Sequence, residues 1–188
     1  LATKNIENDK ILKKSYLYKI TFMLSKIEYG VDLDNIIALI NECAKIDGAL
    51  VILKPHTRGM AINSWKKKLH KDVIDGSSYS SSIIIEWADT VLFTGSSIIF
   101  QPMILEKKII FLKYCQQYET IFDNLTDICL AKTLEDAISF VKRPSMKLDD
   151  RQRINEFIKM HIHNGLSDGL VCKSVVNLIE KMENKSFA

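Results

Sequence analysis

Short apolar segments that do not alternate with polar residues constrain the fold of this chain more than any other feature. They occupy residues 49–53, 90–93 and 109–112, and a β-branched and aromatic segment precedes them at 18–24. Residues 127–130 form a weaker fifth case. Continuous apolar runs of this length are typical of strands buried on both faces, as in a parallel sheet. The sequence therefore predicts parallel strands that are covered on both sides.

Segments with apolar residues at helical spacing lie between these strands. The predicted helices cover residues 34–45, 80–88, 97–106 and 134–141, and polar residues suited to N-caps, such as Thr133, precede them. Strand and helix alternate, which favours βαβ units with right-handed crossovers. We therefore predict an α/β fold, a Rossmann-like open parallel sheet with helices on both faces.

The C-terminal part has a different pattern and is predicted to add further helices at 150–163 and 170–182. A length of 188 residues suits one domain with a sizeable core. We predict a polar segment or linker over residues 1–17 and a single domain over 18–184. The chain does not begin with Met, so we expect it to be a piece of a longer protein.

Basic and acidic residues nearly balance, at 26 and 23, for a net charge of +3. This balance argues against a nucleic-acid partner. The densest basic run is residues 66–68, followed by His70 and Lys71. We interpret it as a solvated face, and a patch for a membrane surface or an acidic ligand is the alternative.

Four cysteines occur without a CxxC pair, which indicates reduced core residues in a cytoplasmic protein. No Cys/His cluster has zinc spacing, so no metal is predicted. His161 and His163 are two residues apart and would face different sides of a helix. No stretch of 18 apolar residues occurs, and no membrane span is predicted.

A basic hexapeptide, KPHTRG at residues 54–59, follows the strand predicted at 49–53. Ligands of open parallel sheets bind beyond the carboxyl ends of the strands. The guanidinium of Arg58 matches phosphate geometry, and His56 can donate to a phosphate oxygen or act as an acid or base. We interpret this segment as a phosphate site, and the alternative is a lone histidine beside solvated charges.

A Gly-Ser-Ser turn, formed by Gly95, Ser96 and Ser97, follows the strand predicted at 90–93. It leads directly into a predicted helix, whose first N–H groups and dipole favour an anion. An ordinary serine N-cap is the alternative. Because His56 follows another strand of the same sheet, we predict that the two segments converge on one anion.

Two other strand ends are weaker candidates for ligand contacts. The loop at 25–30 contains Tyr29 and Gly30, and the turn at 75–78 contains Ser77. The second follows either a short third strand or only a turn before a capped helix. For both loops, a plain turn is an equally good interpretation.

Four segments together resemble the C-terminal domain of GT-B glycosyltransferases. They are KPH at 54–56, WAD at 87–89, GSSI at 95–98 and KKIIFL at 107–112. The resemblance covers about residues 18–141 and is greatest to bacterial surface-polysaccharide enzymes. These include CDP-glycerol glycerophosphotransferases, Kdo transferases, and bacterial sialyl- and polysialyltransferases. The resemblance implies the donor-nucleotide-binding half of such an enzyme.

The resemblance also implies roles for individual residues. His56 would be the catalytic residue. Contacts to the donor and its phosphates would come from Lys54, Arg58, Gly95, Ser96, Ser97 and Gln101. Gln101 stands where many members of the family carry a glutamate that binds the ribose. Asp168 lies in a C-terminal loop that also looks similar and is a further candidate contact.

The implied function is transfer of a sugar or a polyol phosphate from an activated nucleotide to a surface polysaccharide, such as capsule or lipopolysaccharide, or to a lipid-linked acceptor. The activated nucleotide is a substrate, and no cofactor is implied. An N-terminal GT-B domain would be the missing partner, without which we expect no turnover. The implied location is the cytoplasm, with peripheral contact at the inner membrane face. A nucleotide-sugar 2-epimerase-like domain and a non-catalytic binding module are the alternatives on this fold.

Overall fold

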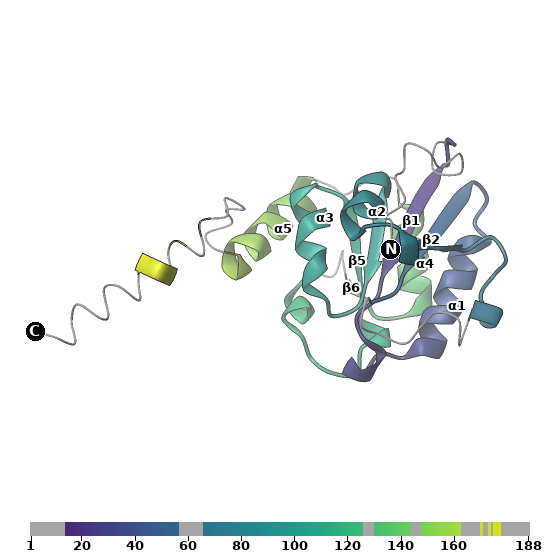
Figure 1. Cartoon of the computed structure of the whole chain (residues 1–188), viewed down its shortest axis with the longest axis horizontal. Coiled ribbons are helices and arrows are strands. Elements are labelled where there is room, and N and C mark those ends of the chain that lie inside the picture. The colour runs from purple at the N-terminus through teal and green to yellow at the C-terminus, as the bar shows by residue number, and fades with distance from the viewer. Residues whose placement is uncertain are drawn as a thin grey trace, which may run out of the picture.

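The computed structural model describes residues 14–56, 66–125, 130–143 and 148–162, together with 170, 173 and 175–177. Within these ranges the strands form one six-stranded parallel sheet with the order β3-β2-β1-β4-β5-β6 (Figure 1). The strands are β1 (Tyr18–Met23), β2 (Ala49–Lys54), β3 (Ile74–Asp75), β4 (Thr90–Phe93), β5 (Lys108–Leu112) and β6 (Leu130–Ala131). The predicted Rossmann-like open parallel sheet is confirmed.

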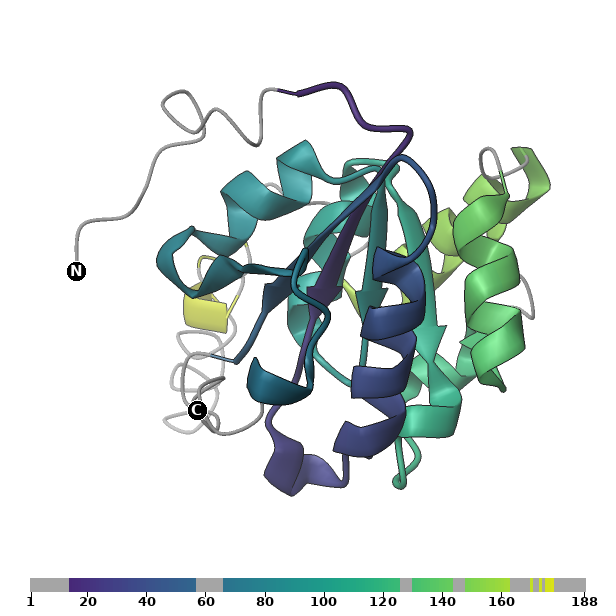
Figure 2. The ribbon, with the colours of Figure 1, turned by 90° about the vertical axis from the view of Figure 1, so that its right-hand side faces the viewer.

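Helices cover both faces of the sheet (Figures 1 and 2). The helices are α1 (Leu33–Ala44), α2 (Ser81–Trp87), α3 (Phe100–Ile104), α4 (Leu134–Lys142) and α5 (Leu148–His161). Residues of α1 and α4 belong to one apolar cluster, and residues of α2, α3 and α5 belong to a second. The sheet separates these two cores, as the fold prediction requires.

The central strands divide their side chains between the two cores. In β4, Val91 and Phe93 join the cluster of α2, α3 and α5, while Leu92 joins the cluster of α1 and α4. All three side chains are buried. Both faces of the strand are therefore apolar, which explains why the sequence shows continuous runs and no alternation.

Capping side chains start the helices where the sequence predicts them. The Asp32 carboxylate accepts from the backbone N–H of Asn35 at 3.1 Å and begins α1. Thr133 and Asp136 form a reciprocal capping box at the start of α4. These bonds satisfy backbone donors that have no partner inside the helix.

The single helix predicted over 97–106 is wrong in its first half. Residues Ser97–Ile99 form a 3-10 turn, η6, and only Phe100–Ile104 are α-helical. Pro102 has no backbone N–H and cannot donate to the carbonyl of Ile98, so this part of the chain takes the tighter turn. The consequence is that Ser96 precedes and Ser97 begins a short 3-10 turn instead of a long helix.

The end of α3 places a side chain in a backbone conformation that favours glycine. Glu106 has φ 51°, in the left-handed region. The backbone N–H of Glu106 donates to Met103 at 3.0 Å, and that of Lys107 donates to Pro102 at 2.9 Å. This pair of bonds is a Schellman motif, whose left-handed position is usually glycine. The Glu106 side chain forms an ion pair with Arg151 at 3.0 Å, and this pair is exposed.

Glu106→Gly is expected to raise the free energy of unfolding by roughly 0.5 kcal/mol. Relief of left-handed strain is worth about 1–2 kcal/mol, and the flexibility of glycine together with the lost surface ion pair offsets part of it. Urea denaturation measures the difference. Glu106→Ala is the control, because it removes the ion pair and keeps the strain. A glycine variant no more stable than the alanine variant would contradict this account.

Two buried thiols make the stability of the domain sensitive to alkaline pH. Burial raises the pKa of Cys43 and of Cys115 from 9.0 to about 12. A pKa that is higher in the folded state gives a contribution that is full below pH 9 and is lost as the pH rises towards 12. We therefore expect Cys43→Ala to flatten the fall of the unfolding free energy above pH 9 by about 1.4 kcal/mol per pH unit. Denaturant titrations on both sides of pH 9 test this, and an unchanged slope would contradict it.

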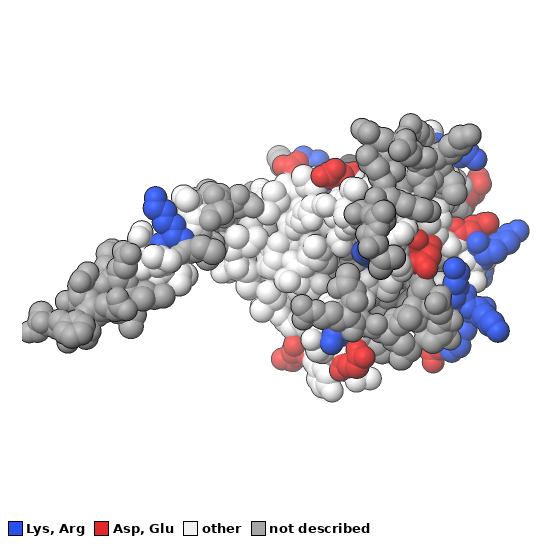
Figure 3. Space-filling view, viewed as in Figure 1, with Lys and Arg blue, Asp and Glu red and all other residues white. Residues whose placement is uncertain are grey.

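The basic run lies on the surface, as interpreted from the sequence. Its first three lysines form the 3-10 turn η4 (Lys66–Lys68), and all three are exposed. Lys68 pairs with Asp34 of α1 at 3.1 Å. Figure 3 shows acidic side chains among the basic ones on this side of the molecule. A membrane or acidic-ligand contact of this run stays a prediction.

The described residues include some of the remaining predicted elements and leave out others. The segment at 75–78 does include a short third strand, β3, which ends at Asp75, and its last three residues form the 3-10 turn η5 (Gly76–Ser78). Of the weak strand predicted at 127–130, Leu130 is described and belongs to β6. Most of the helix predicted at 170–182 lies outside the described residues, as do residues 1–13.

Candidate functional site

A pocket of about 370 Å³ opens at the carboxyl ends of β1, β2 and β4. From β1 the chain builds the sheet outward through β2 and β3, and then returns to the other side of β1 for β4, β5 and β6. The pocket therefore lies at the point where the strand order reverses, which is where open α/β sheets bind ligands. It is lined by Met23, Leu24, Lys54, Pro55, His56, Ser81, Ser96, Ser97 and Ile98.

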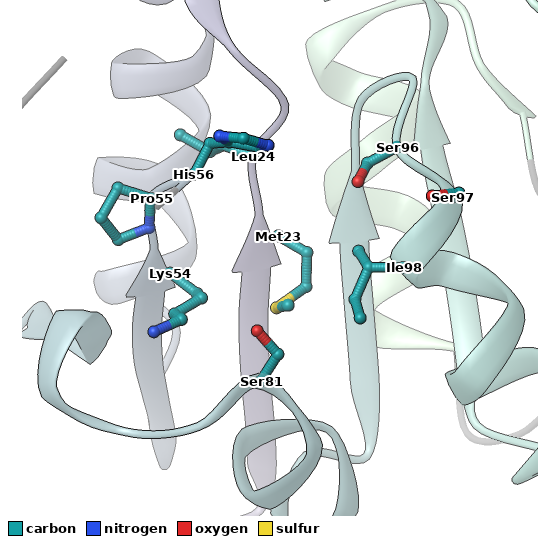
Figure 4. Close-up of a pocket in the computed structure, with 9 residues that line it drawn as sticks. All are labelled: Met23, Leu24, Lys54, Pro55, His56, Ser81, Ser96, Ser97 and Ile98. Atoms are coloured by element: carbon teal, nitrogen blue, oxygen red, sulfur yellow. The ribbon is translucent and has the colours of Figure 1, made fainter. Parts of the chain in front are cut away.

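His56 and the two serines face this pocket from opposite sides. Figure 4 shows His56 beyond the end of β2, with Ser96 and Ser97 across β1 in the turn that follows β4. His56 is half-buried, and Ser97 is exposed. The structure thus brings together three of the residues that the sequence singled out, from two segments that are 40 residues apart (96 − 56).

Ser96 occupies the N-cap position of η6, yet its hydroxyl makes no capping bond. The alternative of an ordinary serine N-cap therefore does not describe this turn. The first N–H groups of a helical turn have no partner within it, and here they adjoin the pocket residues Ser97 and Ile98. The turn presents hydroxyl and backbone donors of the kind that bind oxyanions.

Lys54 lines the pocket, but its ammonium group is already used. The side chain is 6% exposed, and Nζ donates to the carbonyls of Tyr79 at 2.6 Å and of Gly76 and Ser77 at 3.3 Å. A lysine has three N–H donors, so these carbonyls account for all of them. Burial lowers the pKa of Lys54, and the nearby carboxylate of Asp75 partly opposes this. The prediction of a direct ligand contact is therefore replaced by a supporting role for Lys54.

Two buried hydroxyls connect β1 and β4 behind the pocket. The hydroxyls of Ser25 and Thr94 are 2.7 Å apart, and the backbone N–H of Ser25 donates to Thr94 at 3.1 Å. Both side chains are buried. Sequence reasoning missed this pair, although each residue lies just beyond the end of an apolar run, which was the available signal.

A buried glutamine, Gln116, connects the loops that follow β1 and β4. Its Oε1 accepts from the backbone N–H of Gly95 at 3.1 Å, and its Nε2 donates to the carbonyl of Tyr29 at 2.8 Å. We call these two hydrogen bonds of the Gln116 side chain the Gln116 brace. The predicted loop residues Tyr29 and Gly30 belong to the loop that this brace holds, and they do not line the pocket. The Tyr29 side chain is 55% exposed. Gln116 was not predicted, because no local pattern distinguishes it.

Of the remaining candidates, Gln101 and Ser77 are described, and neither lines the pocket. Gln101 lines a separate hollow of about 360 Å³ with residues of α2 and α3 and with Ile162, so its predicted contact with a ribose is not supported. Gln101 shares this hollow with Phe100 and Ile104 of the same helix, and it is not among the residues that line the pocket. The Ser77 hydroxyl donates to Asp75 and is exposed. Arg58 and Asp168 lie outside the described residues.

The described residues were also compared with the requirements for metal binding and for crossing a membrane. Over these residues, no three side chains of His, Cys, Asp or Glu are grouped so that they could hold a metal ion. Among the helices that the structure describes, none has the length and apolar character needed to cross a bilayer.

Comparison with solved structures defines the class of fold. The chain aligns with two structures of the wall teichoic acid polymerase TagF, in which a variant was soaked with CDPG for 30 and for 15 minutes. The TM-scores are 0.50 and 0.52, with 17% and 18% sequence identity. The alignments cover 93% and 90% of this chain and 44% and 42% of the polymerase. No protein-family model and no curated protein sequence matches the chain.

These neighbours support a glycosyltransferase-like fold for this chain. At 17–18% identity the likeness establishes the fold and leaves the chemistry to the residues of the site. The chain spans less than half of the length of the polymerase. The donor, the acceptor and any further domain are therefore matters for a proposal.

Proposed function

We propose that this chain is the donor-binding part of a glycosyltransferase that transfers a sugar or a polyol phosphate from an activated nucleotide. The observation that carries the proposal is that His56, Ser96 and Ser97 line one pocket at the reversal point of the sheet. The pocket volume of about 370 Å³ is in the range of small-molecule sites. The polymerase that shares the fold was soaked with a nucleotide of this kind, CDPG.

In this proposal the pocket holds the phosphates of the donor. The serine hydroxyls and the backbone N–H groups of the 96–98 turn donate to phosphate oxygens, and His56 donates from the opposite side. When the bond to the transferred group breaks, negative charge grows on the phosphate that leaves. Donors that are already aimed at this position stabilise the charge with little reorganisation, which is how such a site accelerates transfer.

Lys54 supports this arrangement from below the pocket surface. Its ammonium holds the carbonyls of the turn that precedes α2, whose first residue, Ser81, also lines the pocket. Its positive charge adds to the potential at the anion site even though its donors are occupied. Lys54 is therefore proposed as a positioning and electrostatic residue.

A second domain completes the proposed enzyme. The chain covers only part of the length of the polymerase with which it aligns, and the acceptor needs a surface facing the donor pocket. We propose that a further domain supplies this surface and the glycan or lipid-linked acceptor site. The isolated chain would then bind donor weakly and show no turnover.

Titration of the chain with CDP, UDP, GDP and CMP, followed by calorimetry or NMR, tests the proposal. We expect saturable binding, tighter for a diphosphate than for CMP, with shifts at the amides of Ser96 and Ser97. Absence of saturable binding at millimolar nucleotide would contradict it and favour a non-catalytic module. Incubation of a longer, two-domain form with UDP-GlcNAc and no acceptor separates transfer from epimerisation, because only an epimerase converts the sugar.

A further inference from the structure

The backbone that precedes the serine turn is held from two sides. Thr94 is bonded to Ser25 at the end of β1, and the next residue, Gly95, donates its backbone N–H to Gln116. A Cβ atom at Gly95 would lie 3.0 Å from Cγ2 of Thr120 and 3.5 Å from Oε1 of Gln116. Gly95 is therefore enclosed, and its position determines where Ser96 begins.

Gln116 is itself anchored to a rigid segment. The residues after β5 pair with the connection between β1 and α1: Asp32 N–H donates to Cys115 at 2.8 Å, and Gln117 N–H donates to Gly30 at 2.8 Å. Between these bonds, Val31 and Gln116 form an isolated antiparallel bridge. The backbone of Gln116 is thus fixed, and its side chain is 7% exposed.

The amide of Gln116 is matched to its two partners. Its oxygen accepts from Gly95, and its nitrogen donates to the carbonyl of Tyr29. A buried amide with both ends satisfied resists rotation, because turning it by half a turn would oppose donor to donor and acceptor to acceptor. Gln116 does not line the pocket. It acts on the pocket only through Gly95.

We propose that Gln116 is a positioning residue that sets the Ser96–Ser97 turn for its anionic ligand. This inference rests on the proposed function. It predicts that loss of the amide displaces the turn and weakens nucleotide binding in a folded protein. A small misplacement of binding groups is enough for a large loss, so we expect Gln116→Leu to bind CDP at least tenfold more weakly, an order-of-magnitude figure.

Asn41 provides a matched control elsewhere in the molecule. Its side-chain amide also joins two segments, donating to the carbonyl of Lys68 at 2.9 Å and accepting from the N–H of His70 at 2.7 Å. Neither Asn41 nor its partners line the pocket. Asn41→Leu should therefore remove a comparable pair of hydrogen bonds and leave CDP affinity unchanged.

Gln116→Glu adds a readout that a merely structural role would not produce. A protonated carboxyl can accept from Gly95 and donate to Tyr29, whereas the ionised form cannot donate. CDP affinity relative to the unmodified chain should therefore recover as the pH falls through the pKa of the new carboxyl. The relative measure cancels the ionisation of CDP, and Gln116→Leu should show no such recovery.

The two proposals fail in different ways. If the unmodified chain binds CDP and Gln116→Leu binds it equally well, the positioning role is wrong and the proposed function stands. If the unmodified chain binds no nucleotide, the proposed function fails. Amide hydrogen exchange then still tests the Gln116 brace. If the Gln116 side chain holds Gly95, the Gly95 amide should exchange faster in Gln116→Leu and not in Asn41→Leu. Equal exchange in the two variants would overturn it.

Discussion

Lys54→Met is expected to lower the free energy of unfolding by about 3 kcal/mol, a large part of the stability of a domain this size. Methionine fills a similar volume but cannot donate. The carbonyls of Ser77 and Tyr79 would lose the ammonium donor, whereas that of Gly76 would keep the N–H of Tyr79 at 3.1 Å. A hydrogen bond to a charged group contributes about 1.5–3 kcal/mol, so loss of the buried bond to Tyr79 supplies most of the expected change. Chemical denaturation by urea, followed by circular dichroism, measures the change.

Lys107→Met is the matched control for this substitution. Lys107 also donates to a backbone carbonyl, that of Glu86 at 2.7 Å, but it does so at the exposed surface. Water replaces an exposed donor, so we expect a change within about 0.5 kcal/mol. Similar losses in both variants would mean that the carbonyls near Lys54 find other partners, and Lys54 would not then hold the turn that leads to α2.

The fold was predictable because its determinants are local. Continuous apolar runs marked β2, β4 and β5, since both faces of these strands are buried, and a β-branched and aromatic segment marked β1. The short edge strand β3 contains two residues and gave only an ambiguous signal. The spacing of apolar residues predicts one helix over 97–106, but this spacing carries no information on the backbone donor that Pro102 lacks.

The site was predictable only where a residue follows a strand directly. His56, Ser96 and Ser97 were identified in this way, and the structure places them on one pocket. The side chains that hold these segments were not identified, because their partners are remote in the sequence. Ser25 and Thr94 are separated by 69 residues.

Lys54 is the opposite case, because the sequence identified the residue but not its hydrogen-bond partners. The family resemblance implied a donor contact for this strand-end lysine, and only the fold reveals that a turn more than 20 residues away supplies carbonyls to its ammonium group. Gln116 and Tyr29, at 87 residues apart, are a similar case. Residue type and position relative to a strand predict where a site lies. Which residues can contact a ligand and which hold the backbone depends on long-range hydrogen bonds.

His56→Ala is expected to weaken CDP binding by about 10- to 100-fold, since a hydrogen bond to a charged group contributes about 1.5–3 kcal/mol. The imidazole reaches the pocket from the end of β2, and alanine at this position removes both ring nitrogens from the pocket. His70→Ala is the control, because His70 lies outside the pocket and beside Asp72. Calorimetric titration of the folded variants measures both affinities.

A double-mutant cycle with Ser96→Ala tests whether the two sides of the pocket act on one ligand group. If His56 and Ser96 bind the same phosphate, removal of one lets the phosphate shift, and the second substitution then has a different effect. We therefore expect the combined loss to differ from the sum of the single losses by at least about 0.5 kcal/mol. Strict additivity would assign His56 and Ser96 to separate groups of the ligand. No effect of either substitution would exclude the side chains of His56 and Ser96 from donor binding and would contradict the proposed convergence of the two segments on one ligand.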